Sequence, residues 1–300
     1  MALLALVGPT ASGKTEAALA IALHLGAEIV SVDSMLVYRG MDVGTGKPTA
    51  EQRAAVPHHL LDLAEPSERF TVARFQELAR GVIRSVARPL LVGGSGLYLR
   101  AVVDDLAFPP EDPVVRASLE AEADDLGAEA LYRRLAEMDP VAAARIEPGN
   151  VRRTIRALEV TAISGAPFSS FAASWDRYDA DRVRPAGIRM DREAQRTRIA
   201  ERVLAMLENG WLDEVQVLVD RGFGAWLTAS QAIGYAELAE HLDGRLSLDE
   251  AAERTVKRTK DLARRQMAWF RRDPRIRWFD AGAAGAPEVA DDIRAYLGSA

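Results

Sequence analysis

The stretch that decides the fold joins an apolar run, Leu3-Leu4-Ala5-Leu6-Val7, to the glycine loop Gly8-Pro9-Thr10-Ala11-Ser12-Gly13-Lys14-Thr15. The loop has the form G-x-x-x-x-G-K-[ST], and residues 15–25 continue with a helical pattern. In such a loop, backbone N–H groups at the start of a helix converge on phosphate oxygens, the Lys14 amine adds a positive charge, and the Thr15 hydroxyl can ligate Mg²⁺. We therefore expect residues 8–15 to bind a di- or triphosphate.

The phosphate loop does not show whether the bound group is a phosphoryl donor or a leaving group. The motif alone favours a kinase or an ATPase. However, a later apolar run, residues 89–92, ends in Gly93-Gly94-Ser95, where many nucleotidases of this type carry an acidic metal ligand. These residues suggest a backbone that passes close to a substrate and a hydroxyl that can donate and accept, although a plain strand-to-helix turn is the alternative.

The remaining pattern predicts an α/β fold with helices flanking a parallel sheet. Buried strands are expected at residues 3–7, 29–32, 90–92 and 186–190, alternating with helical patterns at 15–25 and 72–86. From Glu111 to Asp181 only helical segments are predicted, so residues 111–181 form an insertion between the core segments 1–110 and 182–300. After Asp191 the chain is expected to be helical almost to its end.

Asp33 ends the second predicted strand. In a parallel α/β sheet, ligands bind at the carboxyl ends of the strands, so this carboxylate should lie near the phosphate loop. It could hold Mg²⁺ through water, act as a general base, or cap the helix that follows. Position alone leaves these three roles open.

Composition limits the function classes. The chain has 300 residues, of which 48% are hydrophobic and 27% charged, as in an ordinary globular protein. The absence of cysteine excludes disulfides, Cys-ligated zinc and thiol nucleophiles, and suits the cytosol. The first residues have no basic n-region and too short an apolar run for a signal peptide or a membrane span.

The positive charge is concentrated near the C-terminus. The net charge is −6, yet residues 253–277 contain ten Lys or Arg against three Asp or Glu. At about 100° per residue, the cations of this segment fall on one side of a helix and the apolar residues 262, 263, 267, 269 and 270 on the other. We expect one face to pack and the other to meet anions, unless it is only a solvated charged face.

These residues resemble one family over nearly the whole chain, the tRNA dimethylallyltransferases. The matching blocks, in order, are GPTASGKT at 8–15, DSMLVYRGMDVGTGKP at 33–48, HHLLDL at 58–63, PLLVGGSGLY at 89–98, RRTIRALEV at 152–160, AIGYAEL at 232–238 and TKDLARRQMAWFRR at 259–272. The resemblance implies a P-loop-type core, an inserted helical domain that binds tRNA, and transfer of a dimethylallyl group from its diphosphate to the exocyclic amine of an adenosine next to the anticodon. It implies Mg²⁺ as cofactor, and the anticodon stem-loop and dimethylallyl diphosphate as partners.

The resemblance also implies roles for single residues. Asp33 is the expected base, with Lys14 and Thr15 completing the catalytic set and Thr15 ligating the metal. The diphosphate ligands are Gly8, Pro9, Thr10, Ala11, Ser12, Gly13, Lys14, Thr15 and Arg192. The tRNA contacts are Asp33, Ser34, Met35, Leu36, Ser95, Arg116, Arg152, Arg153, Thr154, Ile155 and Arg156. Leu36 stands where the family usually has Gln, and Ser95 replaces the usual Thr.

The expected chemistry suits these residue types. An adenine amine is a weak nucleophile, so a base at Asp33 assists its attack on an allylic carbon, while loop N–H groups, Lys14 and Mg²⁺ receive the departing charge. A base in an RNA loop is easily flipped from its stack. The alternatives are a prenyltransferase for a free adenine nucleotide, a small-molecule kinase, and a non-catalytic RNA-binding protein. A monomer without membrane contact is expected.

Overall fold

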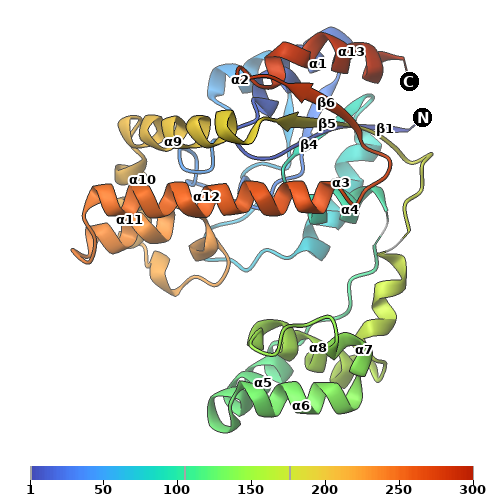
Figure 1. The fold of residues 1–300 in the computed structure, drawn as a ribbon, viewed down its shortest axis with the longest axis vertical. Coiled ribbons are helices and arrows are strands. Elements are labelled where there is room, and N and C mark those ends of the chain that lie inside the picture. Colours follow the sequence, from blue (N-terminus) through green and yellow to red (C-terminus); the bar gives the residue numbers. More distant parts are fainter. Residues whose placement is uncertain (1, 105, 176, 300) are drawn as a thin grey trace. The chain divides into compact units, whose positions relative to one another are not determined.

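The computed structural model describes residues 2–104, 106–175 and 177–299, in two compact units (Figure 1). The core unit is Met1–Val103 with Tyr178–Ala300, and the inserted unit is Asp104–Arg177. The boundaries expected from the prolines, 110/111 and 181/182, lie a few residues further along the chain. The approach to the insertion belongs to the inserted unit because Arg156 donates hydrogen bonds to the carbonyls of Pro109 and Pro110.

A six-stranded parallel sheet of order β3-β2-β4-β1-β5-β6 forms the centre of the core unit. The strands are β1 Leu3–Val7, β2 Glu28–Ser31, β3 His58–His59, β4 Pro89–Gly93, β5 Val183–Met190 and β6 Arg277–Ala281. This confirms the α/β fold with a parallel sheet and the strands predicted within it.

The two edge strands were not predicted. β6 corrects the expectation of helix almost to the C-terminus. The alternation of buried and exposed residues in β6 is short, and charged residues occupy the exposed positions, where Asp280 pairs with Arg189 of β5. β3 is only two residues long, too short to give a recognisable pattern in the sequence, and it is stabilised by its pairing with β2.

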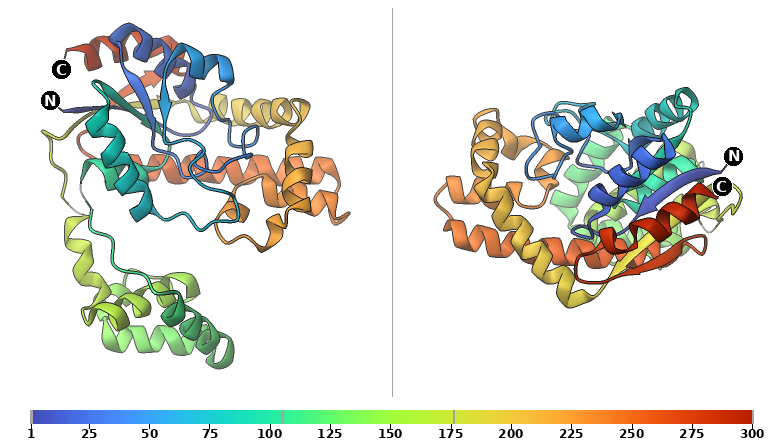
Figure 2. Two further views of the ribbon diagram at one scale, coloured as in Figure 1. Left: turned by 180° about the vertical axis from the view of Figure 1, so that it is seen from behind. Right: turned by 90° about the horizontal axis from the view of Figure 1, so that it is seen from above.

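Both faces of the sheet are covered by helices, as Figures 1 and 2 show. Side chains of successive strand residues point to opposite faces, so Leu4 and Leu6 pack in one cluster with α1 and α13, while Ala5 and Val7 pack in another. The second cluster includes Phe75 of α3 and residues of the C-terminal helices. Burial on both faces explains why the central strands read as continuous apolar runs.

The helices of the core unit surround this sheet. They are α1 Lys14–Leu25, α2 Ala50–Ala55, α3 Val72–Ser85, α4 Gly96–Val103, α9 Arg192–Glu208, α10 Trp211–Asp220, α11 Tyr235–Leu242, α12 Leu248–Phe270 and α13 Ala290–Gly298, with short 3₁₀ turns at Phe223–Ala225, Ala229–Gln231 and Ala286–Val289. Within the described ranges, no helix combines the length and apolar character needed to cross a membrane.

The inserted unit is helical and has its own core. It contains α5 Pro113–Leu126, α6 Ala128–Met138, α7 Pro140–Ala143, α8 Val151–Ser164 and a 3₁₀ segment Phe168–Ser174. Leu119, Leu131, Leu135 and Leu158 are among the residues that fill its interior. Asp112 caps α5 by accepting hydrogen bonds from the N–H groups of residues 114 and 115, and Pro113 stands at the first helical position, where its missing N–H costs nothing.

We predict that Gly93→Ala destabilises the core unit. A Cβ at Gly93 would overlap the carbonyl of Val32 on the neighbouring β2 segment, and backbone cannot move aside cheaply. Overpacking of this kind costs about 1–3 kcal/mol. Gly81→Ala on α3 is the matched control, because nothing lies near that Cβ and alanine favours a helix by up to about 1 kcal/mol. Urea unfolding should separate the two; equal stabilities would contradict the packing described here.

Candidate active site

Three loops leave the same edge of the sheet side by side. β4 lies between β1 and β2, with Val7 opposite Gly93 and Ser31 opposite Val92. Since the strands are parallel and end nearly in register, the phosphate loop, the loop at Ser95 and the turn at Asp33 emerge together. This is the edge where ligands bind in parallel α/β sheets.

The phosphate loop has the backbone form that its sequence predicts. Gly13 is left-handed with φ 79° and precedes α1, which begins at Lys14. Ala11 also has positive φ, 60°, an uncommon conformation for a residue with a side chain. The Lys14 amine donates to the carbonyl of Pro9 at 2.6 Å, and Thr15 is exposed at the start of the helix.

Two cations and one carboxylate share the space beside this loop. The pKa of the Lys14 amine is lowered from 10.5 to about 7, mainly by burial and to a smaller extent by the charge of the Arg202 guanidinium. The charge of Asp33 opposes that shift. Burial likewise lowers the pKa of Arg202, again opposed by Asp33. Desolvated cations that lack a full set of anionic partners favour an anionic ligand. Asp33 therefore lies close to the phosphate loop, as the sequence predicted.

Asp33 makes a local turn contact as well. Its Oδ1 accepts the N–H of Met35 at 2.9 Å and so stabilises a turn. The next helix, α2, begins only at Ala50, so Asp33 is not the helix cap that its sequence position also allowed. The side chain is half-buried, and no hydrogen bond to its other oxygen is recorded from the described residues. A single contact to one oxygen leaves the second free to accept a proton or a ligand.

The loop after Asp33 is fastened by a carboxylate from α10. Glu214 accepts the N–H groups of Asp42 at 2.8 Å, Val43 at 2.7 Å and Gly44 at 3.2 Å, and the hydroxyl of Tyr235 at 2.5 Å. All four partners are donors, so an ionised carboxylate fits this position and an amide would not. Burial, and next the charge of Glu214, raise the pKa of Tyr235, which therefore remains a donor.

A buried lysine fastens the same loop from within. The Lys47 amine donates to the carbonyl of Tyr38 at 2.6 Å and to Asp62 at 2.7 Å. Gly46, one residue before Lys47, has positive φ and lies against the Arg202 guanidinium, where a Cβ would overlap it. The fastened loop therefore forms one wall of the space that holds Arg202.

Helix α9 faces the phosphate loop, but through residues later than Arg192. Arg192 is exposed at the first turn, and no contact between it and the loop is recorded in the described part of the chain. Instead Gln195 donates to the Thr10 carbonyl at 3.0 Å, and Arg198 donates to the Ala11 carbonyl at 3.1 Å. The i, i+3, i+7 spacing of positions 195, 198 and 202, directly after a strand, was the signal available in the sequence.

Comparison with known proteins assigns the family. The family model for IPP transferase matches residues 36–273, and that for isopentenyl transferase matches residues 1–62. The chain belongs to the IPP transferase family. It is 47% identical to the tRNA dimethylallyltransferase of Desulforudis audaxviator (strain MP104C), over 99% of this chain and 97% of that protein. It is also 47% identical to the one from Salinispora tropica, over 96% and 90%. The solved tRNA isopentenylpyrophosphate transferase of Bacillus halodurans has a TM-score of 0.71 and 40% identity, covering 99% and 96% of the two chains.

In this family member, the predicted RNA contacts of the inserted unit differ in accessibility. Arg152 and Arg153 are exposed on α8, whereas Thr154 and Ile155 are buried. Thr154 donates its hydroxyl to the Asn150 carbonyl. The two buried side chains are not presented on the surface, so only Arg152 and Arg153 of this run offer free charge.

Arg116 and Arg156 are held by a buried carboxylate. Glu159, whose side chain is fully buried, accepts from Arg116 at 2.6 Å and from Arg156 at 2.8 Å, and also from the Asp112 N–H. The arginines lower the pKa of Glu159 against the effect of its burial. Both predicted contacts therefore have a structural partner inside the inserted unit.

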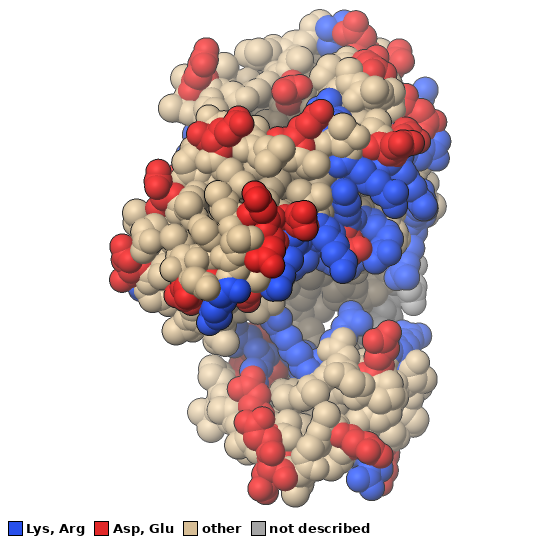
Figure 3. All heavy atoms as spheres, turned by 60° about the vertical axis from the view of Figure 1, so that its left-hand side comes forward, with Lys and Arg blue, Asp and Glu red and all other residues tan. Residues whose placement is uncertain are grey.

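The basic segment is a helix followed by a turn. α12 ends at Phe270, so Arg271 and Arg272 lie just beyond it. Phe270 and Ala263 are buried as expected, while seven cations are exposed: Arg254, Lys257, Arg258, Arg264, Arg265, Arg271 and Arg272. Figure 3 shows Lys and Arg gathered on one area of the core unit. Lys257, Arg265, Arg271 and Arg272 form no ion pair with any described residue, which leaves their charge available.

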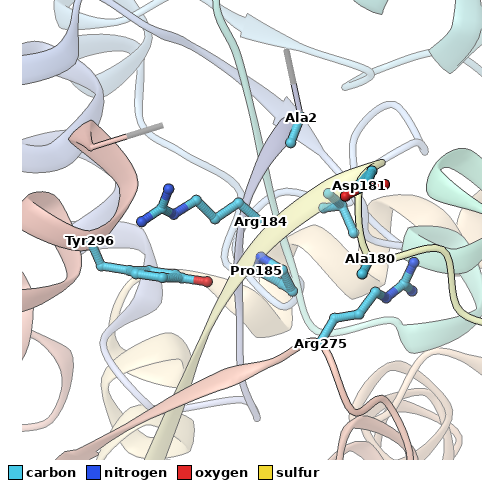
Figure 4. A pocket seen from close by; sticks show the side chains of 8 residues that line it. Ala2, Ala180, Asp181, Arg184, Pro185, Arg275 and Tyr296 are labelled. Atoms are coloured by element: carbon cyan, nitrogen blue, oxygen red, sulfur yellow. The ribbon is translucent and has the colours of Figure 1, made fainter.

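A cluster of metal-ligating side chains or a second hollow could also hold a charged ligand. Among the described residues, no three His, Cys, Asp or Glu side chains cluster as metal ligands. A hollow of about 360 Å³ lies at the opposite end of β1 and β5, lined by Ala2, Arg184, Arg275 and Tyr296 among others (Figure 4). Arg275 there forms an ion pair with Asp273 at 2.7 Å, while Arg184 donates to the Ser299 hydroxyl at 2.8 Å and lies over the Tyr296 ring.

We predict that binding of inorganic diphosphate takes up a proton at Lys14. Below about pH 7 the amine is already charged; above it, the ligand must pull the pKa upward, so affinity should fall with rising pH by up to about tenfold per pH unit. Lys14→Arg keeps its charge throughout, and its profile reports only the titration of the ligand. Calorimetry at a series of pH values around 7 should show that diphosphate affinity falls more steeply with rising pH in the wild type than in Lys14→Arg. If the two proteins had parallel profiles of affinity against pH, the lowered pKa of Lys14 would be contradicted.

Proposed function

We propose that the chain transfers a dimethylallyl group from dimethylallyl diphosphate to the exocyclic amine of an adenosine next to the anticodon in tRNA. The observation that carries this is the placement of Asp33 within electrostatic reach of Lys14 and Arg202, beside a phosphate loop whose neighbouring strand ends in glycines and a serine. A base and an anion site lie together, without the acidic metal ligand of a phosphoryl-transfer enzyme. The relatives' name, tRNA dimethylallyltransferase, supplies the substrates.

In the proposed reaction the adenosine amine attacks the first carbon of the allylic group. A C–N bond forms, the C–O bond to diphosphate breaks, and its electron pair leaves with the diphosphate. Asp33 takes the amine proton as the new bond forms. Loop N–H groups, Lys14 and Arg202 face the oxygen on which negative charge develops. The two cations, partly desolvated before the ligand binds, are suited to a leaving group of high charge.

Mg²⁺ would be bound through the substrate together with Thr15. The exposed Thr15 hydroxyl at the start of α1 is the fitting side chain, and this ion commonly uses one or two protein ligands with substrate phosphates. When bound, the ion neutralises charge on the departing diphosphate. Gly8 to Gly13 and Arg192 remain the proposed further diphosphate ligands, with Gln195, Arg198 and Arg202 supporting or adding to them.

The RNA would be held by the charged surface of each unit. We assign phosphate contacts to the cations of α12 and its following turn, and to Arg152 and Arg153 on α8. Ser34, Met35, Leu36 and Ser95 lie on the two loops beside the phosphate loop, where an extruded adenosine would have to enter. Arg116 and Arg156 can contact RNA only while shared with Glu159. Because the substrate is tRNA, the cytosol is the proposed location, and a monomer the proposed form.

The test of this function uses purified protein with dimethylallyl diphosphate or ATP, each with an anticodon stem-loop or with free AMP. We expect prenylated RNA only from dimethylallyl diphosphate with the stem-loop. Prenylated AMP at a comparable rate would favour the free-nucleotide enzyme. Phosphoryl transfer from ATP would indicate a kinase. Tight RNA binding with no product from any mixture would leave only a binding function.

We predict that Asp33→Asn folds normally but loses turnover by a factor of about 10² to 10⁴. Asparagine keeps the oxygen that accepts the Met35 N–H, but it cannot accept the proton. Asp292→Asn, an exposed change on α13, is the control. Single-turnover transfer to a stem-loop should be measured with Mg²⁺ titrated. Rates near those of the wild type, or rescue by excess metal, would exclude the base assignment.

We predict that the double change Arg265→Ala and Arg271→Ala weakens RNA binding and flattens its salt dependence. Each lost phosphate contact reduces counterion release, so the slope of log affinity against log salt should become shallower by about 0.7–0.9 per contact. Arg84→Ala with Arg294→Ala, on α3 and α13, is a control of equal charge change. If both double variants kept the wild-type slope, the α12 face would be merely solvated.

A further inference from the structure

Side-chain amides hold both backbone groups of Thr10, and so two successive peptides of the phosphate loop, Pro9–Thr10 and Thr10–Ala11. The N–H of Thr10 donates to Gln266 Oε1 at 2.8 Å, and the Thr10 carbonyl accepts from Gln195 Nε2 at 3.0 Å. Gln195 comes from α9 and Gln266 from α12, elements more than 180 residues away in the sequence. The Lys14 amine holds the carbonyl of the Pro9–Thr10 peptide from within the loop at 2.6 Å, and the C-terminal helices supply the other two contacts.

These contacts matter because the loop contains a strained residue next to Thr10. Ala11 stands at φ 60°, a conformation that costs free energy and persists only where the surroundings enforce it. If either peptide at Thr10 were free to rotate, the N–H groups of the following loop residues would point in other directions. Those groups must converge on the diphosphate for the loop to bind it.

Gln266 reaches the loop because two neighbouring positions have no side chain. A Cβ at Gly94 would lie 2.5 Å from Gln266 Nε2, and one at Gly96 would overlap the ring of Trp269, one turn further along α12. The half-buried Gln266 thus fits between the loop after β4 and the phosphate loop. Its neighbour Arg265 is exposed on the outer side of the same helix.

We infer that Gln266 is a positioning residue for diphosphate binding, which holds the N–H of the Pro9–Thr10 peptide so that the N–H groups of the phosphate loop that follow face the ligand. The identity of the diphosphate rests on the proposed function; the positioning does not. Gln266 contacts the loop backbone, and its effect on the ligand passes through Thr10. The consequence is that α12 carries an inward support for the diphosphate site as well as outward cations.

The test is the change Gln266→Met, which keeps the length of the side chain and removes its hydrogen-bonding groups. Loss of one hydrogen bond and of the loop order it maintains should weaken inorganic diphosphate binding about three- to tenfold. The KM for dimethylallyl diphosphate should rise by the same factor, while the stem-loop KM and the thermal unfolding midpoint stay near those of the wild type. Gln216→Met, on the exposed face of α10, is the matched control and should bind diphosphate as the wild type does.

A second variant reaches the same contact without removing a polar group. Gly94→Ala places a methyl group against the Gln266 amide and should displace it from Thr10, so diphosphate binding should weaken here too. In the Gln266→Met background the added effect of Gly94→Ala should shrink, because both changes act on one contact.

Three results would overturn the inference. One is diphosphate affinity within twofold of the wild type in folded Gln266→Met; another is a parallel loss of RNA affinity and thermal stability, which marks a general structural role. The third is a wild-type protein that does not bind inorganic diphosphate. A wild type that binds diphosphate but transfers nothing to RNA would contradict the proposed function alone, since the binding measurement requires no turnover.

Discussion

The parallel pairing of β2, β4 and β1 is the constraint on which the site depends. Because Val7 lies opposite Gly93 and Ser31 opposite Val92, the three loops that follow start from one line at one edge. No side chain of these loops has to reach across the sheet. A shift of one residue in either pairing would move a loop along the edge and turn its strand's side chains to the wrong face.

The loops themselves are held by side chains of the helices α9, α10 and α12. Glu214 accepts hydrogen bonds from three backbone N–H groups of the loop after Asp33. The backbone of the phosphate loop is hydrogen-bonded by Gln195, Arg198 and Gln266. Backbone groups near a ligand must be paired or aimed at the ligand, since unpaired ones are costly when buried. The C-terminal helices thus complete a site whose phosphate loop, Asp33 and Ser95 all lie in the first hundred residues.

The sequence predicted the parts that depend on local pattern. The phosphate loop and the strands through Val7 and Met190 follow from apolar runs and glycine spacing, and Asp33 was placed beside Lys14 by the rule for parallel sheets. Residues whose role depends on tertiary contact were missed. Arg202, Glu214 and Gln266 are polar residues on amphipathic helices, and neither the helical spacing of Arg202 nor the block that contains Gln266 shows which groups these side chains contact. The edge strand β6 was missed because its exposed charges hide a short alternation. The helical insertion was predicted from its helical sequence pattern. The burial of Thr154 and Ile155 was not, because it depends on how α8 packs in the inserted unit, which the neighbouring arginines do not indicate.

The central claim is that the phosphate loop receives a leaving group and does not present a phosphoryl donor. It is tested most directly by following the oxygen that bridges carbon and phosphorus in dimethylallyl diphosphate labelled there with heavy oxygen. If the C–O bond breaks during transfer to the stem-loop, mass spectrometry should find all the label in the released diphosphate and none in the prenylated RNA. Label retained in dimethylallyl alcohol or in dimethylallyl monophosphate would show that a P–O bond breaks and would contradict the account.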